Sequence, residues 1–185
     1  MYKVQVTIKG LTPLRYNRFL IRGKDEPNIG KMTHEEQIQN ALDRSYRDDK
    51  GQFYVPDDVL GACIINGGKK VKIGRSGASK LLEAIMIFEN EKFYVGTDKY
   101  KIQQGVVRIP PKTGARILQY WVVIEKWKVD FEVTILDSVF PSNGLKESIE
   151  MAGMYYCLLD GRPKLGRFEL THYKKIKELK QEKGK

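Results

Sequence analysis

The chain opens with a strict alternation of apolar and polar residues. The apolar positions are Tyr2, Val4, Val6 and Ile8. A period of two is typical of a strand with one buried face. The pattern therefore predicts a strand over residues 2–9, which the segment Gly10–Pro13 ends.

Helical spacing follows in several segments. Thr33 and Glu36 form a capping box in front of an apolar stripe, which predicts a helix over residues 33–46. A short strand over 52–55 leads to Pro56, which favours a helix start and is followed by two aspartates in the first turn. Further helices are expected over 80–88 and 145–156.

The clearest pair of strands is predicted later in the chain. Residues 117–124 and 127–136 have strand patterns on either side of a turn at Glu125–Lys126, and a last strand is expected over 165–170. The resulting order is that of an α+β fold with a ferredoxin-like or RRM-like βαββαβ core. We expect one domain over residues 1–173, with a large insertion at about 67–114 between the first core helix and the central strand pair. A lysine-rich tail over 174–185 is expected to form a frayed helix.

The charge of the chain is strongly basic and unevenly placed. The 185 residues carry 33 Lys and Arg against 23 Asp and Glu, a net charge of +10. Residues 66–80 hold five cations and no acid, and the tail holds six lysines and two glutamates. Such a field attracts polyanions, although a basic tail can also serve solubility alone.

Few residues suit metal or acid–base chemistry. Cys63 and Cys157 are the only cysteines and lie in apolar contexts, so both are expected to be buried thiols. His34 and His172 are the only histidines, and both are expected to be solvated. We therefore predict no catalytic residue, no metal and no cofactor. No apolar run is long enough to span a membrane and no signal peptide is recognisable, which favours a cytoplasmic protein.

Two motifs could imitate a phosphate or metal site. Gly67–Gly68–Lys69–Lys70 lacks the spacing and the preceding strand of a phosphate-binding loop, which excludes a nucleoside triphosphatase of that class. Asp25 and Glu26 lie in a basic loop and could hold a metal ion near a phosphate.

Three cationic stretches are the candidates for a nucleic-acid interface. In residues 15–22, arginines alternate with Tyr16 and Phe19, a combination that suits phosphates and base stacking, although either ring could belong to the core. The loop ahead of the last strand places cations beside Gly161 and Gly166, which would let a polyanion approach the backbone. The predicted contacts are Arg15, Tyr16, Arg18, Lys69, Lys70, Lys72, Arg75, Arg162, Lys164 and Arg167. We expect the three stretches to form one continuous track.

Three segments carry a resemblance to a known group of proteins. "VTIKGLTPL", "FYVPDDVLGACI" and "GRPKLGRFEL" resemble the RAMP superfamily of CRISPR-associated proteins, above all the backbone subunit that polymerises along crispr RNA. The Pro-led helix with a small-residue step is matched by Val55, Pro56, Leu60, Gly61 and Ala62. The same segments also resemble proteins encoded by phages and by archaeal viruses or plasmids.

The resemblance implies binding of single-stranded nucleic acid, mostly through its phosphates. It also implies an insertion that reaches a neighbouring subunit or displaces bases, for which residues 67–114 are the candidate. Our first hypothesis is therefore a module of antiviral defence that binds single-stranded RNA or DNA without sequence preference. It would assemble as a homo-oligomer along the strand or as a subunit of a ribonucleoprotein.

Two alternatives remain open at this stage. An RNA-processing nuclease of the same superfamily would need His34, His172 or Asp25 close to a bound phosphate. A viral or plasmid accessory protein would instead use its basic patches on an acidic protein partner.

Overall fold

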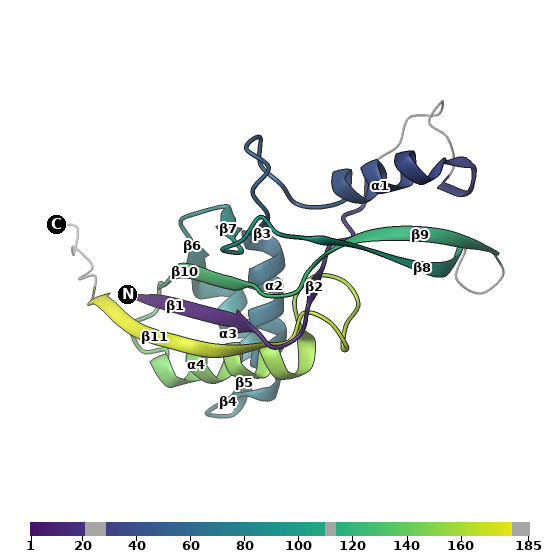
Figure 1. The fold of residues 1–185 in the computed structure, drawn as a ribbon. Coiled ribbons are helices and arrows are strands. Elements are labelled where there is room, and N and C mark those ends of the chain that lie inside the picture. Colours follow the sequence, from purple (N-terminus) through teal and green to yellow (C-terminus); the bar gives the residue numbers. More distant parts are fainter. Residues whose placement is uncertain (21–28, 110–113, 179–185) are drawn as a thin grey trace.

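A four-stranded antiparallel sheet forms the centre of the molecule. The computed structural model describes residues 1–20, 29–109 and 114–178. The sheet order is β11 (Phe168–Glu178), β1 (Tyr2–Gly10), β10 (Lys128–Ile135) and β6 (Met86–Phe88). Figure 1 shows β1 between β11 and β10, as the register requires. The predicted alternation of β1 is confirmed, because its even-numbered side chains from Tyr2 to Ile8 are buried.

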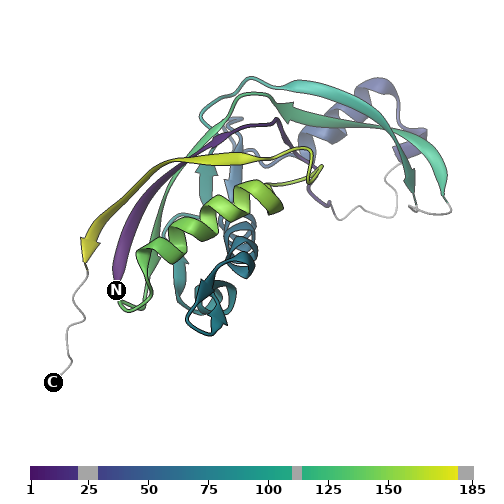
Figure 2. The same ribbon diagram turned by 90° about the horizontal axis from the view of Figure 1, so that it is seen from below.

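One helical layer covers the buried face of this sheet. It consists of α2 (Asp57–Gly67), α3 (Ala78–Ile85) and α4 (Ser142–Met151), and α4 continues as the π-helical segment η3 (Ala152–Tyr156). Figure 2 shows α4 beneath β11 and β1. Apolar side chains of the strands meet Leu60, Ile64, Leu145 and Ile149 in a single core.

The central sheet and its helical layer together contain strands and helices in the order strand, helices, two strands, helix and strand, and the expected α+β fold class is confirmed. The helix predicted directly before residue 67 is present as α2. The second core strand differs from the predicted one: it is β6, which lies, like α3, inside the range 67–114 expected to be an insertion. β6 has only three residues, too few to show a period, and they were predicted as the end of the helix over 80–88.

The helix predicted over residues 33–46 and the segment predicted as second core strand form a separate arm. β9 (Ala115–Ile124) pairs with β8 (Lys101–Ile109) and, at its end, with β2 (Leu14–Arg15), and it does not pair with β10. α1 (His34–Asp43) has the predicted capping box and packs against β9 (Figure 1). The turn at Glu125–Lys126 therefore joins two sheets, and the predicted pairing of 117–124 with 127–136 is wrong.

The last strand is longer than its pattern suggested. β11 begins at Phe168 and continues to Glu178, so residues 174–178 of the lysine-rich tail are strand and the predicted frayed helix is wrong for them. Pairing with β1 supplies the backbone partners that a helix would have supplied internally. Residues 179–185 lie outside the described part of the chain.

Two small antiparallel strand pairs complete the fold. β3 (Tyr54–Pro56) pairs with β7 (Lys92–Tyr94), and after the 3-10 turn η2 (Gly68–Lys70), β4 (Lys72–Ile73) pairs with β5 (Ser76–Gly77). A further 3-10 turn, η1 (Ile29–Lys31), precedes α1. No helix in the described ranges is long and apolar enough to cross a membrane.

Candidate nucleic-acid interface

The loop of residues 158–167 joins η3 to β11 and is held on both sides by backbone hydrogen bonds. The amide of Asp160 donates to the carbonyl of Arg15 at 3.1 Å, and that of Gly166 donates to Pro13 at 2.8 Å. The amides of Leu11 and Thr12 donate to the Arg167 carbonyl. Arg15, at the start of the cationic stretch 15–22, is therefore in direct contact with the loop of residues 158–167.

The two glycines of this loop serve its own closure. Gly161 and Gly166 have φ angles of +84° and +74°, a region that favours glycine. A Cβ on buried Gly166 would overlap the Leu158 carbonyl oxygen, and one on Gly161 would lie 2.8 Å from Leu165 Cδ1. The expected role of Gly166 in backbone approach is thus corrected, because protein atoms already occupy the space beside it.

Most amides of the loop are also used within the protein. Those of Leu158, Lys164 and Leu165 donate inside the loop, and that of Arg167 donates to Thr12 Oγ1 at 2.9 Å. A concave row of free amides is what would bind an anion. An anion at this loop would therefore have to be bound mainly by side chains.

Arg15 holds the loop in place. Its Nε and one terminal nitrogen lie 3.0 and 2.8 Å from the same carboxylate oxygen of Asp160, and its guanidinium stacks 4.5 Å from the centre of the Trp121 ring. These contacts already use the cation that was expected to meet a phosphate.

Tyr16 cannot act as a stacking platform. Its side chain is fully buried, and its hydroxyl donates to the Tyr54 carbonyl at 3.2 Å. Burial raises the pKa of this phenol well above its usual value. The expected contact with a base is corrected, because a ring with no exposed face has no surface to offer.

Arg18 is exposed but lies on a different part of the surface. Its guanidinium is 5.7 Å from the centre of the Tyr46 ring, and its backbone is bonded to Arg44. Residues 21–28, which include Arg22 and Asp25, lie outside the described residues.

The cationic stretch of residues 69–75 and the loop of residues 158–167 both contact η3, at the C-terminal end of α4. Lys70 Nζ lies 5.7 Å from the Tyr155 ring centre, and a terminal nitrogen of Arg167 donates to the Met154 carbonyl. Both contacts fall on η3, which packs tightly on α2 (Figure 2). We call Lys69, Lys70, Tyr155, Arg162 and Lys164 the basic surface.

The cations of the basic surface have no acidic partner among the described residues. Lys69, Lys70, Arg162 and Lys164 are exposed, and none forms an ion pair with a described carboxylate. Arg167 is partly buried, since its guanidinium bonds the carbonyls of Met154 and Pro163. It therefore orders the loop that carries its two exposed neighbours.

Sequence reasoning missed Tyr155, which has the exposed ring beside a cation that was expected of Tyr16. It is 55% exposed and lies beside Lys70. The signal was present in the helical period: Ile149, Ala152 and Tyr156 were placed on the inner face, so Tyr155, about 100° away, had to point outward.

Lys72 and Arg75 lie toward the other end of α4. Their hairpin, β4–β5, packs through Ile73 onto Gly144, where a Cβ would lie 2.6 Å from Ile73 Cδ1. The helical rise from residue 144 to residue 155 corresponds to about 16 Å. Both cations are exposed.

The two cysteines are buried, and the two histidines lie on different elements, α1 and β11. Cys63 donates to the Cys157 carbonyl, and burial raises the pKa of its thiol to about 12, which confirms a buried core thiol. His34 Nδ1 lies 2.8 Å from the Tyr120 hydroxyl, and His172 is exposed on β11 opposite Thr7. Within the described ranges, no group of three or more His, Cys, Asp or Glu residues is placed to hold a metal ion.

Comparison with known proteins identifies the fold. A chain of type III-B Cmr-beta bound to cognate target RNA superposes with a TM-score of 0.58 at 13% identity, covering 95% of this chain and 61% of that one. Cmr6 from Pyrococcus furiosus superposes with a TM-score of 0.50 at 10% identity, covering 90% of this chain and 96% of that one. The chain thus spans less than two thirds of the Cmr-beta protein. At these identities the likeness shows the fold alone.

Comparison of sequences alone gives no relative. No family model and no curated protein sequence matches the chain.

Proposed function

We propose that the chain binds single-stranded RNA through its phosphates, with little sequence preference, as a subunit of a CRISPR-type ribonucleoprotein. The observation that carries the proposal is the basic surface, where exposed Lys70 lies beside the exposed ring of Tyr155. The other three exposed cations, which also lack a described acidic partner, belong to η2 and to the loop that follows η3. The neighbour solved with target RNA has the same fold over nearly the whole chain, which favours RNA over DNA.

The cations of the basic surface come from two segments that are far apart in the sequence, η2 and the loop of residues 158–167. Phosphates contacted by Lys and Arg release counterions, which gives affinity without reading bases. Tyr155 adds a ring on which any base can stack. Lys72 and Arg75 extend the surface along α4, within reach of a strand that already contacts Tyr155.

A salt titration of RNA binding tests the proposal. The affinity of a fluorescent uridine oligonucleotide is measured by anisotropy at increasing KCl concentrations. If roughly five phosphates are neutralised, the log–log slope is near −3.5 for a single strand. A slope near zero would contradict the proposal.

Variants then locate the interface. The double variant Lys70→Ala/Arg162→Ala should reduce the magnitude of the slope by about 1.4, because two phosphate contacts are lost. Lys31→Ala/Lys146→Ala removes the same charge from η1 and α4 outside the basic surface and should leave the slope unchanged. Equal slopes for both double variants would place the RNA elsewhere.

The two tyrosines give a second matched pair. Tyr155→Ala should weaken binding by about 1–3 kcal/mol through lost stacking and change stability little, because the ring is exposed. Tyr16→Phe should leave RNA affinity unchanged and lower stability by about 1 kcal/mol, because it removes a buried hydroxyl that donates to Tyr54.

A further inference from the structure

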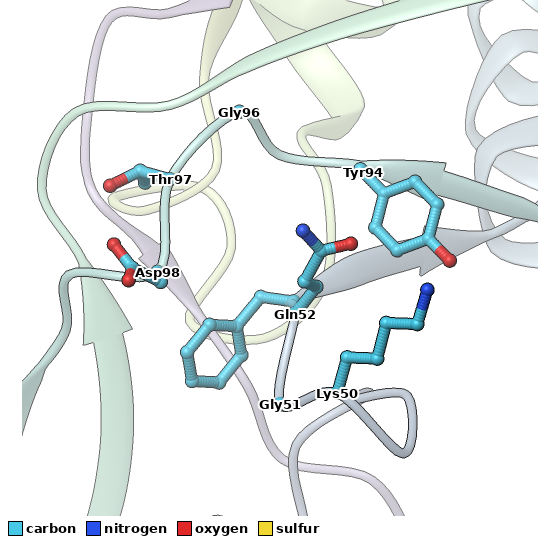
Figure 3. Close-up of a pocket in the computed structure, with 8 residues that line it drawn as sticks. Lys50, Gly51, Gln52, Tyr94, Gly96, Thr97 and Asp98 are labelled. Carbon is cyan, nitrogen blue, oxygen red and sulfur yellow. The ribbon is translucent and has the colours of Figure 1, made fainter.

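Three depressions of the surface meet at Gly96, and none of them is lined by a residue of the basic surface. Their volumes are about 500, 490 and 560 Å³, and Gly96 lines all three. Figure 3 shows the first, with Tyr94 and Gln52 above Lys50 and with Thr97 and Asp98 on the opposite side. The φ angle of +72° at Gly96 lets the chain turn sharply between β7 and β8. We call the three depressions together the Gly96 groove.

The lining of the groove is strongly cationic. Six lysines line it, and they face two carboxylates. Lys101 pairs with Glu125 at 2.7 Å, and Lys128 pairs with Asp130 at 2.8 Å. Among described residues, Lys99 and Lys126 have no carboxylate partner, so their charge is available to an anion.

Two tyrosines place aromatic surface in the same groove. Tyr94 is 44% exposed and Tyr100 is 43% exposed. Tyr94 lies opposite Tyr54 on the neighbouring strand and donates to Asp48 Oδ2 at 3.1 Å. Tyr100 packs edge-on against buried Phe53, with 5.5 Å between the ring centres. Both rings are therefore held in place while part of their surface stays open.

One end of the groove adjoins the loop of residues 158–167. The third depression is lined by Leu11, which is 60% exposed and whose amide donates to the Arg167 carbonyl at 2.8 Å. A strand that leaves this loop can therefore enter the groove across Leu11.

We propose that the Gly96 groove is a second binding site for the same single strand, in which bases stack on Tyr94 and Tyr100 and phosphates contact Lys99 and Lys126. This inference rests on the proposed function, since it assumes that the ligand is RNA. Alternating rings and lysines suit an unpaired strand, because a duplex hides its base faces. The volumes fall in the range of pockets that enclose small ligands.

Photo-crosslinking tests the two sites separately. The full chain is irradiated with a 5-bromouridine oligonucleotide, and the attached peptides are identified by mass spectrometry. We expect adducts at Tyr155 and also at Tyr94 or Tyr100. Adducts at Tyr155 alone would overturn this inference and leave the proposed function intact, whereas the absence of RNA binding by anisotropy would overturn both.

Variants of the groove give a quantitative test. Tyr100→Ala should weaken binding of a long oligonucleotide roughly tenfold, and Tyr100→Phe should preserve it, because stacking needs the ring and not the hydroxyl. Thermal unfolding of both variants checks that the Phe53 contact is not the cause. Lys99→Ala/Lys126→Ala should lower the salt slope by about 1.4, whereas Lys31→Ala/Lys146→Ala should not.

Competition decides between RNA and an acidic protein as the occupant. Poly-L-glutamate at equal charge should fail to suppress adducts at Tyr94 and Tyr100, because it offers no rings to stack. Complete suppression by poly-L-glutamate, or equal affinities of Tyr100→Ala and Tyr100→Phe, would overturn the assignment.

Discussion

At the scale of single residues, glycines determine the conformation of the loop that carries Arg162 and Lys164. Gly166 is buried at a φ of +74°, and its missing side chain leaves room for the Leu158 carbonyl. The loop is therefore fixed by backbone geometry before any ligand binds. The fixed conformation of the loop keeps the side chains of Arg162 and Lys164 exposed.

We predict that Gly166→Ala lowers the free energy of unfolding by roughly 2–5 kcal/mol, because strain and overlap add. The measurement is urea denaturation followed by circular dichroism. Gly74→Ala is the matched control, since Gly74 has a φ of +60° with nothing within 4 Å of its Cβ position, and it should cost about 1 kcal/mol. Equal costs for the two variants would mean that the Leu158 contact is unimportant.

The carboxyl group of Asp48 is expected to make the stability of the fold depend on pH. Burial alone would raise the pKa of its carboxyl, but the amides of Gln52 and Lys50 and the Tyr94 hydroxyl outweigh that effect and hold the pKa below its ordinary value of 3.8. A carboxyl with a lowered pKa adds stability above its unfolded pKa, and this stability is lost as the pH falls through its folded pKa.

Asp48→Asn should therefore make the thermal midpoint less dependent on pH below about pH 4. The midpoint is measured in a series of acidic buffers for the wild-type chain, Asp48→Asn and Asp49→Asn. The last variant removes a neighbouring exposed carboxylate as the control for charge. If the wild-type chain and Asp48→Asn lose stability in parallel, the hydrogen bonds to Asp48 do not carry this dependence.

At the scale of elements, the sequence predicted the helices and strands whose own residues show a full period of buried and exposed positions. β1, α2 and α4 bury a face with a full local period, and their positions are confirmed. β9 and β10 also have clear strand patterns, but a pattern does not name a partner. Pairing of β9 with β8 is decided by packing across the arm, which a local reading cannot contain.

The candidate site was predictable to the same extent. Charge and glycine spacing located the loop of residues 158–167 and the cations of η2. They could not show that Asp160 pairs with Arg15 or that Tyr16 is buried, because both depend on contacts between segments distant in sequence. The Gly96 groove depends on β7, β8 and residues 50–53 coming together, and no local motif marks it.

The junction of α2 with α4 gives a prediction at this scale. Gly67 lets the end of α2 approach α4 so closely that a Cβ would overlap the Ser148 carbonyl and lie 2.7 Å from the Ala152 nitrogen. Gly67→Ala should therefore lower the free energy of unfolding by roughly 2–4 kcal/mol. It should also weaken RNA binding, because Lys69 and Lys70 follow directly.

Gly61→Ala in the same helix is the matched comparison. Its Cβ would meet only the side chains of Phe88 and Met86, at 3.3 and 3.7 Å, and these can adjust. We expect a change below about 1 kcal/mol in chemical denaturation. A larger loss for Gly61→Ala than for Gly67→Ala would show that the close approach of α2 and α4 is not what limits this position.

At the scale of the whole molecule, the cations gather on the helical layer and around the Gly96 groove, while the open face of the sheet is mixed in charge. On that face, Lys3 pairs with Glu132 and Lys128 pairs with Asp130. An RRM-type reader stacks bases on aromatic residues of this face, whereas the residues of β1 that face outward are Lys3, Gln5, Thr7 and Lys9. On β1, the open face therefore offers no ring on which a base could stack, in line with the proposed use of the helical side and the loops.

The β8–β9 arm supports the last prediction, that chains assemble side by side on a long strand. It extends away from the core (Figure 1) and exposes the side chains of Val106 and its cross-strand partner Leu118, which are 65% and 42% exposed.

Uridine oligonucleotides of increasing length should therefore bind increasing numbers of chains in sedimentation velocity. Val106→Asp should stop this growth without changing the affinity for a short oligonucleotide, whereas Val139→Asp, a control at an exposed position outside the arm, should not. One bound chain at every length would contradict assembly along the strand, and unchanged growth with Val106→Asp would exclude this part of the arm as the contact.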